Sequence, residues 1–236
     1  MNTLLHTADS RGKADHGWLK SFHTFSFSSY YNAERVHFGA LRVLNDDTVA
    51  PGMGFGTHPH DNMEIISIPL AGDLEHRDSM GNTTIIREGD VQVMSAGTGI
   101  RHSEMNHNKD KEVRFLQIWI IPEKKNVEPR YDQQNFSGAD KTNRWLTVVS
   151  PLGTPDGGVQ VHQQTWFSLS KLEAGKSLEY SLHRKGNGVY LFILEGTAEV
   201  NGQALARRDG LAITDTDQLS VSSASGAEIL LMEIPV

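Results

Sequence analysis

The 236-residue chain contains no cysteine. It therefore has no disulfide bond, no thiol nucleophile and no thiolate that could bind a metal ion. Iron–sulfur clusters and other soft-metal thiolate sites are excluded, because they need cysteine ligands. Any metal site in this protein is therefore built without thiolate ligands.

Long apolar runs and concentrated positive charge are also missing. No apolar stretch approaches the roughly 20 residues that cross a bilayer, and the first residues lack the basic and apolar regions of a secretory signal. With 29 acidic against 22 basic residues, the formal net charge is −7, which argues against a nucleic-acid-binding surface. We expect a cytoplasmic monomer with no direct nucleic-acid partner and no membrane partner.

The chain also lacks a sustained helical periodicity. This third absence favours an all-β fold with little helix. Short apolar stretches alternate with turns rich in Gly, Asn and Asp, as in a β-sandwich or barrel. Apolar periodicity disappears after residue 122 and returns near residue 145. We predict an N-terminal domain at 1–122, a linker at 123–145 and a C-terminal domain at 146–236.

The second half of the chain weakly repeats the first, which predicts two similar β-barrels. Three pairs of segments resemble each other: 65–72 and 189–196, 88–94 and 208–213, and 116–122 and 230–235. The second copy lacks the histidine pairs of the first. We therefore expect the C-terminal domain to be structural or lid-forming, without metal ligands.

The first half does contain two pairs of side chains of the kinds that bind metal ions, which we call metal-type side chains. His58 and His60 form one pair, and His102 and Glu104 form the other. Residues two apart in a strand share a face, so each pair can point in one direction. Either pair alone would more often be ordinary surface or turn residues. Together, three imidazoles and one carboxylate predict a site for one divalent transition-metal ion.

Two stretches before this site also predict strands. Residues 21–27 alternate as a strand does, and we expect His23 to be buried and hydrogen-bonded rather than a metal ligand. Residues 38–44 are the next predicted strand, which Asn45 and the two following aspartates should end with a turn. The glycine-rich residues 51–56 lack the Gly-Lys-Ser/Thr ending of a phosphate loop. We therefore interpret these glycines as positions where the backbone lies close to a metal pocket.

Both metal-type pairs lie in runs that resemble the two motifs of the cupin superfamily. The matching residues are Gly52, His58, His60 and Glu64 in the first motif, and Gly99, His102 and Asn106 in the second. Three features depart from the cupin pattern, among them Gly97 where a proline is expected. The same departures are typical of pirins, and the chain resembles bacterial pirin-like proteins in several segments: 14–19, 23–27, 41–47, 56–64, 76–82 and 94–104.

The resemblance to pirins implies a bicupin, with two double-stranded β-helix barrels and metal only in the first. It implies His58, His60, His102 and Glu104 as ligands, whereas in ordinary cupins the carboxylate comes from the first motif, here Glu64. We prefer Glu104, both as ligand and as catalytic base. Glu64 is then expected beside the ligands or at the rim of the core, and Asn106 beside the ligands.

The same resemblance implies an activity. Bacterial pirin-like proteins are described as quercetin dioxygenases, which implies metal-dependent cleavage of quercetin-like flavonols with O2 and release of carbon monoxide. We expect Fe(II), although Mn, Ni, Cu, Co or Zn would suit the same ligands. The alternative is a metal- or redox-responsive regulatory protein without turnover, as some pirins are. Isomerase chemistry is a third reading, because a fold does not fix a function.

Overall fold

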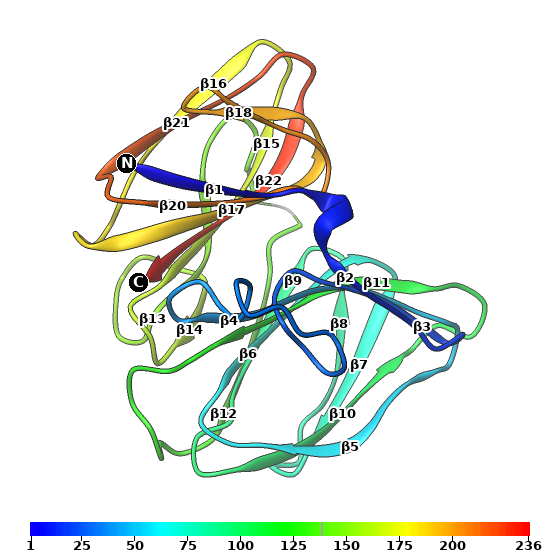
Figure 1. Ribbon diagram of the computed structural model, residues 1–236. Helices are drawn as coiled ribbons and strands as arrows, with labels where there is room; N and C mark the ends of the chain where they lie inside the picture. Colours follow the sequence, from blue (N-terminus) through cyan, green and yellow to red (C-terminus); the bar gives the residue numbers. More distant parts are fainter. Residues whose placement is uncertain (138) are drawn as a thin grey trace.

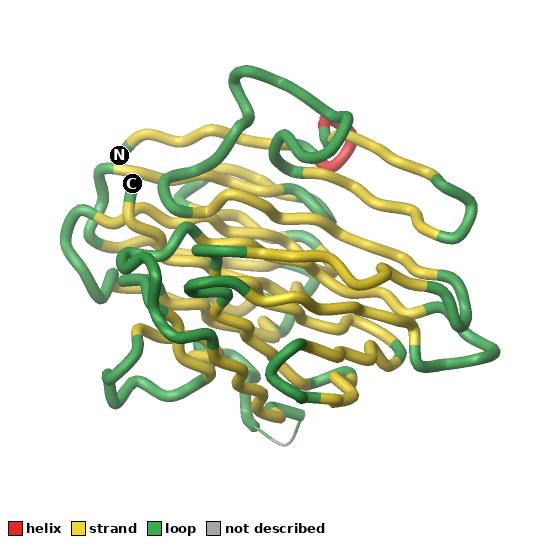
Figure 2. Tube along the Cα trace, turned by 90° about the horizontal axis from the view of Figure 1, so that it is seen from below, coloured by secondary structure: helices red, strands yellow, loops and turns green. Residues whose placement is uncertain are grey.

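The computed structural model describes residues 1–137 and 139–236, and strands dominate it (Figures 1 and 2). In these residues the only helix is the short 3-10 turn η1 (Ala8–Ser10). The strands form four sheets, two of seven strands and two of four. The all-β prediction is confirmed. No described helix has the length and apolar character needed to span a membrane.

The N-terminal unit consists of one large and one small sheet that face each other. The large sheet has the spatial order β12 (Arg130–Asn135), β9 (Asp90–Ser95), β6 (Glu64–Ala71), β11 (Val113–Ile120), β4 (Leu41–Val49), β3 (Leu19–His23) and β2 (Gly12–Asp15). The small sheet has the order β5 (Gly54–His60), β10 (Ile100–Asn106), β7 (Asp73–Asp78) and β8 (Thr83–Arg87).

The C-terminal unit, in the upper half of Figure 1, repeats this arrangement. Its large sheet has the order β1 (Asn2–His6), β20 (Gly210–Thr214), β17 (Asn187–Gly196), β22 (Ala227–Pro235), β15 (Trp166–Leu172), β13 (Leu146–Pro151) and β14 (Val159–Val161). Its small sheet has the order β16 (Lys176–Ser181), β21 (Gln218–Ser223), β18 (Ala198–Val200) and β19 (Gln203–Leu205). Each unit is a two-layer jelly roll, and the sheets are not joined into a closed hydrogen-bonded ring in the described residues.

The internal repeat appears directly in the strand order. The neighbours β9-β6-β11 of one large sheet correspond to β20-β17-β22 of the other. These are the strands that the three similar segment pairs occupy. The prediction of two similar units is therefore confirmed, and both are of the cupin type that the resemblance implied.

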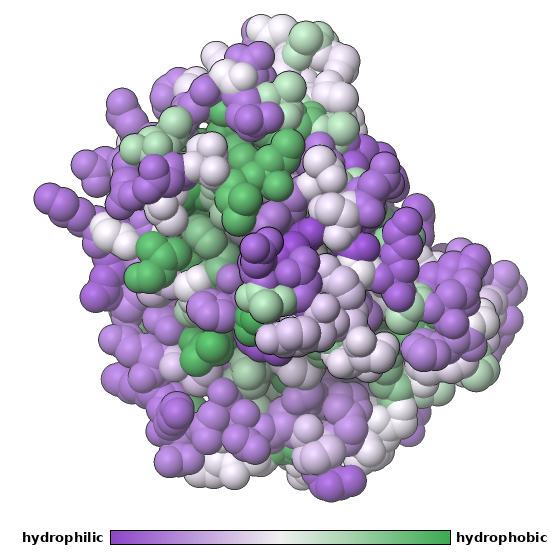
Figure 3. All heavy atoms as spheres, in the orientation of Figure 1, coloured by the Kyte–Doolittle hydropathy of each residue, from purple (hydrophilic) through white to green (hydrophobic). Residues whose placement is uncertain are grey.

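An apolar core between the two large sheets joins the units. It includes Ile66 and Ile118 from one unit and Phe192 and Met232 from the other, all buried. Strands in such a sheet are buried on both faces, which explains why β6 and β17 read as nearly continuous apolar runs. The face of the molecule shown in Figure 3 is mainly hydrophilic, and its apolar atoms gather mainly in the upper half of the view.

Three segments differ from the predicted organisation. β1, placed in the N-terminal domain by the sequence, pairs with β20 of the C-terminal unit. β12 lies in the predicted linker but extends the N-terminal large sheet beside β9. β4 continues to Val49 instead of ending in a turn at Asn45. In all three cases, pairing with a distant strand decides the structure of a segment whose local sequence is polar or ambiguous.

A polar layer crosses the interior of the N-terminal unit. Register places one buried polar side chain on each of five neighbouring strands: His23, Asn45, Gln117, Ser67 and Gln92. Apolar clusters lie to either side, one around Phe115 and Leu74 and the other around Ile65 and Met94. Directly paired residues share a face of the sheet, so the layer faces the small sheet that carries the metal-type residues.

Candidate metal centre

The structure brings His58, His60 and His102 together on the small sheet. β5 and β10 pair so that His58 lies opposite His102, and His60 lies opposite Ile100. One ring nitrogen from each histidine lies within 4.8 Å of those of the other two. The ring centroids are 4.5–4.9 Å apart. These three imidazoles form the candidate metal centre.

A glycine lets the two ligand strands approach this closely. A Cβ atom added to Gly54 would lie 2.2 Å from the backbone oxygen of Glu104. Any other residue would therefore push β5 away from β10. A register shift between His102 and Glu104 follows on the same strand pair. The glycine-rich approach to His58 thus permits close backbone contact, as its sequence indicates.

Hydrogen bonds orient two of the imidazoles. His58 Nδ1 lies 2.8 Å from the carbonyl oxygen of Gly56, to which it donates, and this leaves Nε2 with its lone pair. His102 Nδ1 lies 3.5 Å from Nδ1 of His76, whose Nε2 is 3.0 Å from an Asp78 carboxylate oxygen. This buried Asp78–His76 pair supports the His102 ring from behind, as outer-shell partners of metal-binding histidines do.

The electrostatics of the cluster favour neutral imidazoles. Burial, together with the neighbouring rings, lowers the pKa of His60 to about 4 and that of His102 to about 3. His102 Nε2 is buried and has no hydrogen-bond partner among the described residues. Neutral imidazoles with a free nitrogen are the form that binds a divalent transition ion. The residues present therefore fit such an ion.

Glu104 lies beside the three histidines but outside their group. Its buried carboxylate accepts hydrogen bonds from Ser67 Oγ at 3.1 Å and from Gln117 Nε2 at 2.6 Å. It lines the same cavity as His58 and His60. The polar layer of the large sheet thus holds this carboxylate next to the cluster.

Glu64 and Asn106 have hydrogen-bond partners away from the cavity. Neither residue lines the cavity. Glu64 accepts a hydrogen bond from Ser95 at 2.7 Å, and burial raises its pKa to about 6. It shares the face of β6 with Ile66, in the core between the two units. Asn106 donates to backbone carbonyls, including that of Val49 at 3.0 Å, and so ties loops together.

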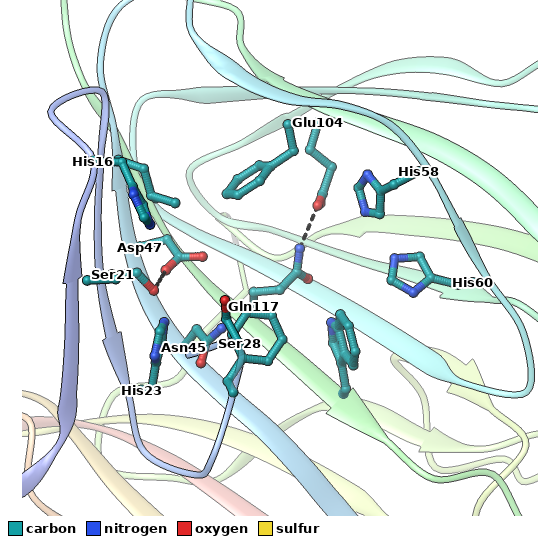
Figure 4. A pocket seen from close by; sticks show the side chains of 15 residues that line it. His16, Ser21, His23, Ser28, Asn45, Asp47, His58, His60, Glu104 and Gln117 are labelled. Atoms are coloured by element: carbon teal, nitrogen blue, oxygen red, sulfur yellow. Dashed lines mark hydrogen bonds between the residues drawn. The ribbon is translucent and has the colours of Figure 1, made fainter. Parts of the chain in front are cut away.

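A cavity of about 190 Å³ opens beside the candidate centre (Figure 4). His58 and His60 lie on one side, and Phe27, Phe55 and Trp119 contribute aromatic walls. The remaining lining residues come from β2, β3, β4, β10, β11 and adjoining loops. No described residue of the C-terminal unit lines the cavity.

Sequence reasoning missed His76, Gln117, Asn45 and Asp47. The sequence predicts a turn at the last two, although they share the odd-numbered face of the strand with the buried residues Leu41, Val43 and Val49. Asp47 is buried, and it accepts a hydrogen bond from Ser21. Burial raises the pKa of its carboxyl to about 7. His76 opens the pirin-like segment 76–82, but its role follows only from its distance to His102, which the sequence does not give.

Comparison with known proteins extends over the whole chain. The profile of a family described as Pirin matches residues 5–120, and that of a Quercetinase C-terminal cupin domain matches residues 147–234. Quercetin 2,3-dioxygenase of Escherichia coli (strain K12) is 43% identical over 98% of this chain and 98% of the relative. The crystal structure of YhhW from Escherichia coli has a TM-score of 0.94 and 41% identity, over 99% of this chain and 98% of that one.

A second crystal structure, of the bacterial pirin YhhW from Escherichia coli in complex with nickel(II), matches almost as closely. Its TM-score is 0.93 at 40% identity, and the match covers 99% of both chains. The likeness therefore includes both units and is not confined to the histidine motifs.

The buried Asp47 carboxyl makes stability depend on pH. Its folded-state pKa of about 7 exceeds the ordinary 3.8, so the folded chain retains a proton that the unfolded chain releases. Stability is then lost as pH rises from about 4 to about 7. We expect Asp47→Asn to raise the free energy of unfolding at pH 8 by on the order of 4 kcal/mol, at about 1.4 kcal/mol per pKa unit.

Urea unfolding of the wild type and the variant at pH 5 and pH 8 measures this difference. The gain from Asp47→Asn should be smaller at pH 5 than at pH 8. Asp110→Asn, the same exchange at an exposed position, serves as the control. An equal effect of Asp47→Asn at both pH values would show that the carboxyl is not held protonated by burial.

Proposed function

Because the chain belongs to the pirin family, we propose that it is a metal-dependent dioxygenase that cleaves quercetin-like flavonols with O2 and releases carbon monoxide. The observation that carries this proposal is the convergence of three imidazoles next to a cavity with aromatic walls. The name of the Escherichia coli relative supports the same reaction. Flavonol and O2 are then the small-molecule substrates.

We propose His58, His60 and His102 as ligands of one divalent ion, with Glu104 as the fourth ligand. Three nitrogen donors and one oxygen donor suit several first-row metals. Fe(II) is our first choice, and the nickel(II) complex of the similar pirin supports Ni as an alternative. When bound, the ion supplies a Lewis acid for the enol and carbonyl oxygens of the substrate and a route for electrons to O2.

Glu104 is the proposed proton acceptor. A flavonol carries an acidic enol next to a carbonyl, and oxidation requires loss of the enol proton. The carboxylate of Glu104 lines the cavity and takes this proton, while Ser67 and Gln117 hold it in place. Because the Gln117 amide contacts it at 2.6 Å, the base has a defined position before the substrate arrives.

The walls of the cavity have a separate task. Phe27, Phe55 and Trp119 present apolar surface to a flat aromatic substrate and displace water from it. The Trp119 ring lies edge-on to His60, with centroids 4.9 Å apart, and to Phe27, with centroids 5.4 Å apart. These contacts hold the aromatic wall against the candidate centre, so a substrate on it lies close to the metal.

An oxygen-electrode assay of metal-reconstituted protein with quercetin, scored also for carbon monoxide, tests the function. We expect oxygen uptake that requires both metal and quercetin, with carbon monoxide as a product. His60→Ala should abolish stoichiometric metal and lower kcat/KM by about 100-fold or more, because it removes a ligand. His37→Ala changes an exposed histidine outside the site and is the control.

No oxygen uptake with iron, manganese, nickel, cobalt or copper loaded would rule out the dioxygenase. Metal binding without turnover, together with a partner whose binding depends on the metal, would then favour the regulatory alternative.

The two candidate carboxylates can be separated by a matched pair of variants. Glu104→Gln keeps the size of the side chain but removes its charge and basicity, so we expect kcat to fall about 100-fold and metal affinity to fall with it. Glu64→Gln makes the same exchange behind the sheet and should leave both quantities near those of the wild type. A larger loss of metal affinity in Glu64→Gln would reverse the assignment of the carboxylate ligand.

A further inference from the structure

The side of the cavity opposite the histidines has a polar character that the metal centre does not explain. Ser21 and His23 of β3 pair with Asp47 and Asn45 of β4, respectively. Each of the four lines the cavity and is only 2–4% exposed. We name these four residues the polar wall. Figure 4 shows them on one side of the cavity, with His58 and His60 on the other.

The hydrogen-bonding capacity of the polar wall is only partly used. Ser21 donates to Asp47. Among the described residues, His23 Nδ1 and Asn45 Oδ1 have no hydrogen-bond partner although both atoms are buried. Trp119 Nε1, on the aromatic wall of the same cavity, is also buried without a partner. Buried polar groups are nearly always paired, so these three groups leave unused hydrogen-bonding capacity beside one cavity.

The chemistry of these groups restricts that molecule. Asn45 Oδ1 accepts hydrogen bonds, Trp119 Nε1 donates them, and an imidazole nitrogen does either. Burial raises the pKa of Asp47 to about 7, so its carboxyl also donates as well as accepts near neutral pH. Among the residues that the structure describes, no lysine or arginine lines the cavity. A carboxylate or phosphate would find no cation here, whereas hydroxyl groups, which both donate and accept, match the polar wall.

The aromatic side chains around the polar wall favour a ligand whose hydroxyl groups are attached to an aromatic ring. Phe27 packs edge-on against both His23 and Trp119, with ring centroids 5.3 and 5.4 Å apart. A ligand in the cavity therefore contacts these aromatic side chains when it reaches the polar groups. A planar ring lies against these side chains while its hydroxyls extend to the polar wall.

We propose that the polar wall is a specificity subsite that binds phenolic hydroxyls on the ring that the substrate turns away from the metal. This inference rests on the proposed function, since it concerns the same cavity. The substrate then bridges the cavity, with its enol and carbonyl oxygens toward His58 and His60 and its hydroxylated ring toward Asn45 and His23. Hydroxylation of the distant ring, rather than the reacting ring, determines which flavonols bind well.

Three flavonols that share the reacting ring test this directly. Galangin has no hydroxyl on the distant ring, kaempferol has one and quercetin has two. Dissociation constants are measured through quenching of tryptophan fluorescence with zinc-loaded protein without oxygen, so binding is observed apart from turnover. We expect the Kd to fall in this order, by about tenfold or more overall, because unpaired polar groups penalise the analogue that lacks the hydroxyls.

Variants then locate the preference. Asn45→Leu and His23→Phe each remove hydrogen-bonding groups at similar size, and both should reduce the ratio of the galangin Kd to the quercetin Kd toward one. Asn2→Leu, the same exchange on the exposed first strand, should keep the wild-type ratio. Circular dichroism verifies that each variant is folded. The comparison of the three flavonols on the wild-type protein does not depend on any variant.

The outcomes separate this inference from the proposed function. Equal Kd values for the three flavonols in the wild type would overturn the subsite alone, and oxygen-dependent cleavage could still be observed. A ratio that persists in both Asn45→Leu and His23→Phe would place the hydroxyls elsewhere and also overturn it. Binding of none of the three flavonols would contradict the proposed function and, with it, the subsite.

Discussion

The structure of the N-terminal unit depends on one constraint: three imidazoles inside a β-sandwich need partners for their ring nitrogens. Polar rings inside a protein are costly unless each finds a partner. Here Gly56 O orients His58, and the Asp78–His76 pair supports His102, while the remaining nitrogens face one another. The free nitrogens are satisfied when an ion lies between them, which is why we propose one.

The polar layer of the large sheet follows from the same constraint. Gln117 and Ser67 hold the Glu104 carboxylate, and the layer continues along the register to Asn45 and His23. Because this layer interrupts the apolar interior, the core of the N-terminal unit is divided into clusters on either side. The large core shared with the C-terminal unit supplies apolar burial elsewhere. The C-terminal unit contributes Phe192 and Met232, among others, to that shared core.

The sequence predicts those features that depend on local spacing. Residues two apart in a strand share a face, so His58 and His60 could be paired before their distance to His102 was known. The repeated apolar segments likewise correspond to equivalent strands in the two large sheets. Features that depend on distant partners were not predictable in this way. Asn45 and Asp47 carry turn chemistry, yet pairing with β3 and β11 keeps them in a strand and turns them into the cavity. The carboxylate of Glu64 matches a motif but lies behind the sheet.

X-ray absorption of the zinc-loaded protein measures the proposed ligand set most directly. If the three imidazoles hold one ion, the spectrum should require three imidazole nitrogens at about 2.0–2.1 Å and one oxygen donor that Glu104→Gln alters. The His102→Ala protein should show one imidazole fewer or no bound zinc. One or no imidazole in the wild type, or an unchanged spectrum in His102→Ala, would contradict a metal centre at these three histidines.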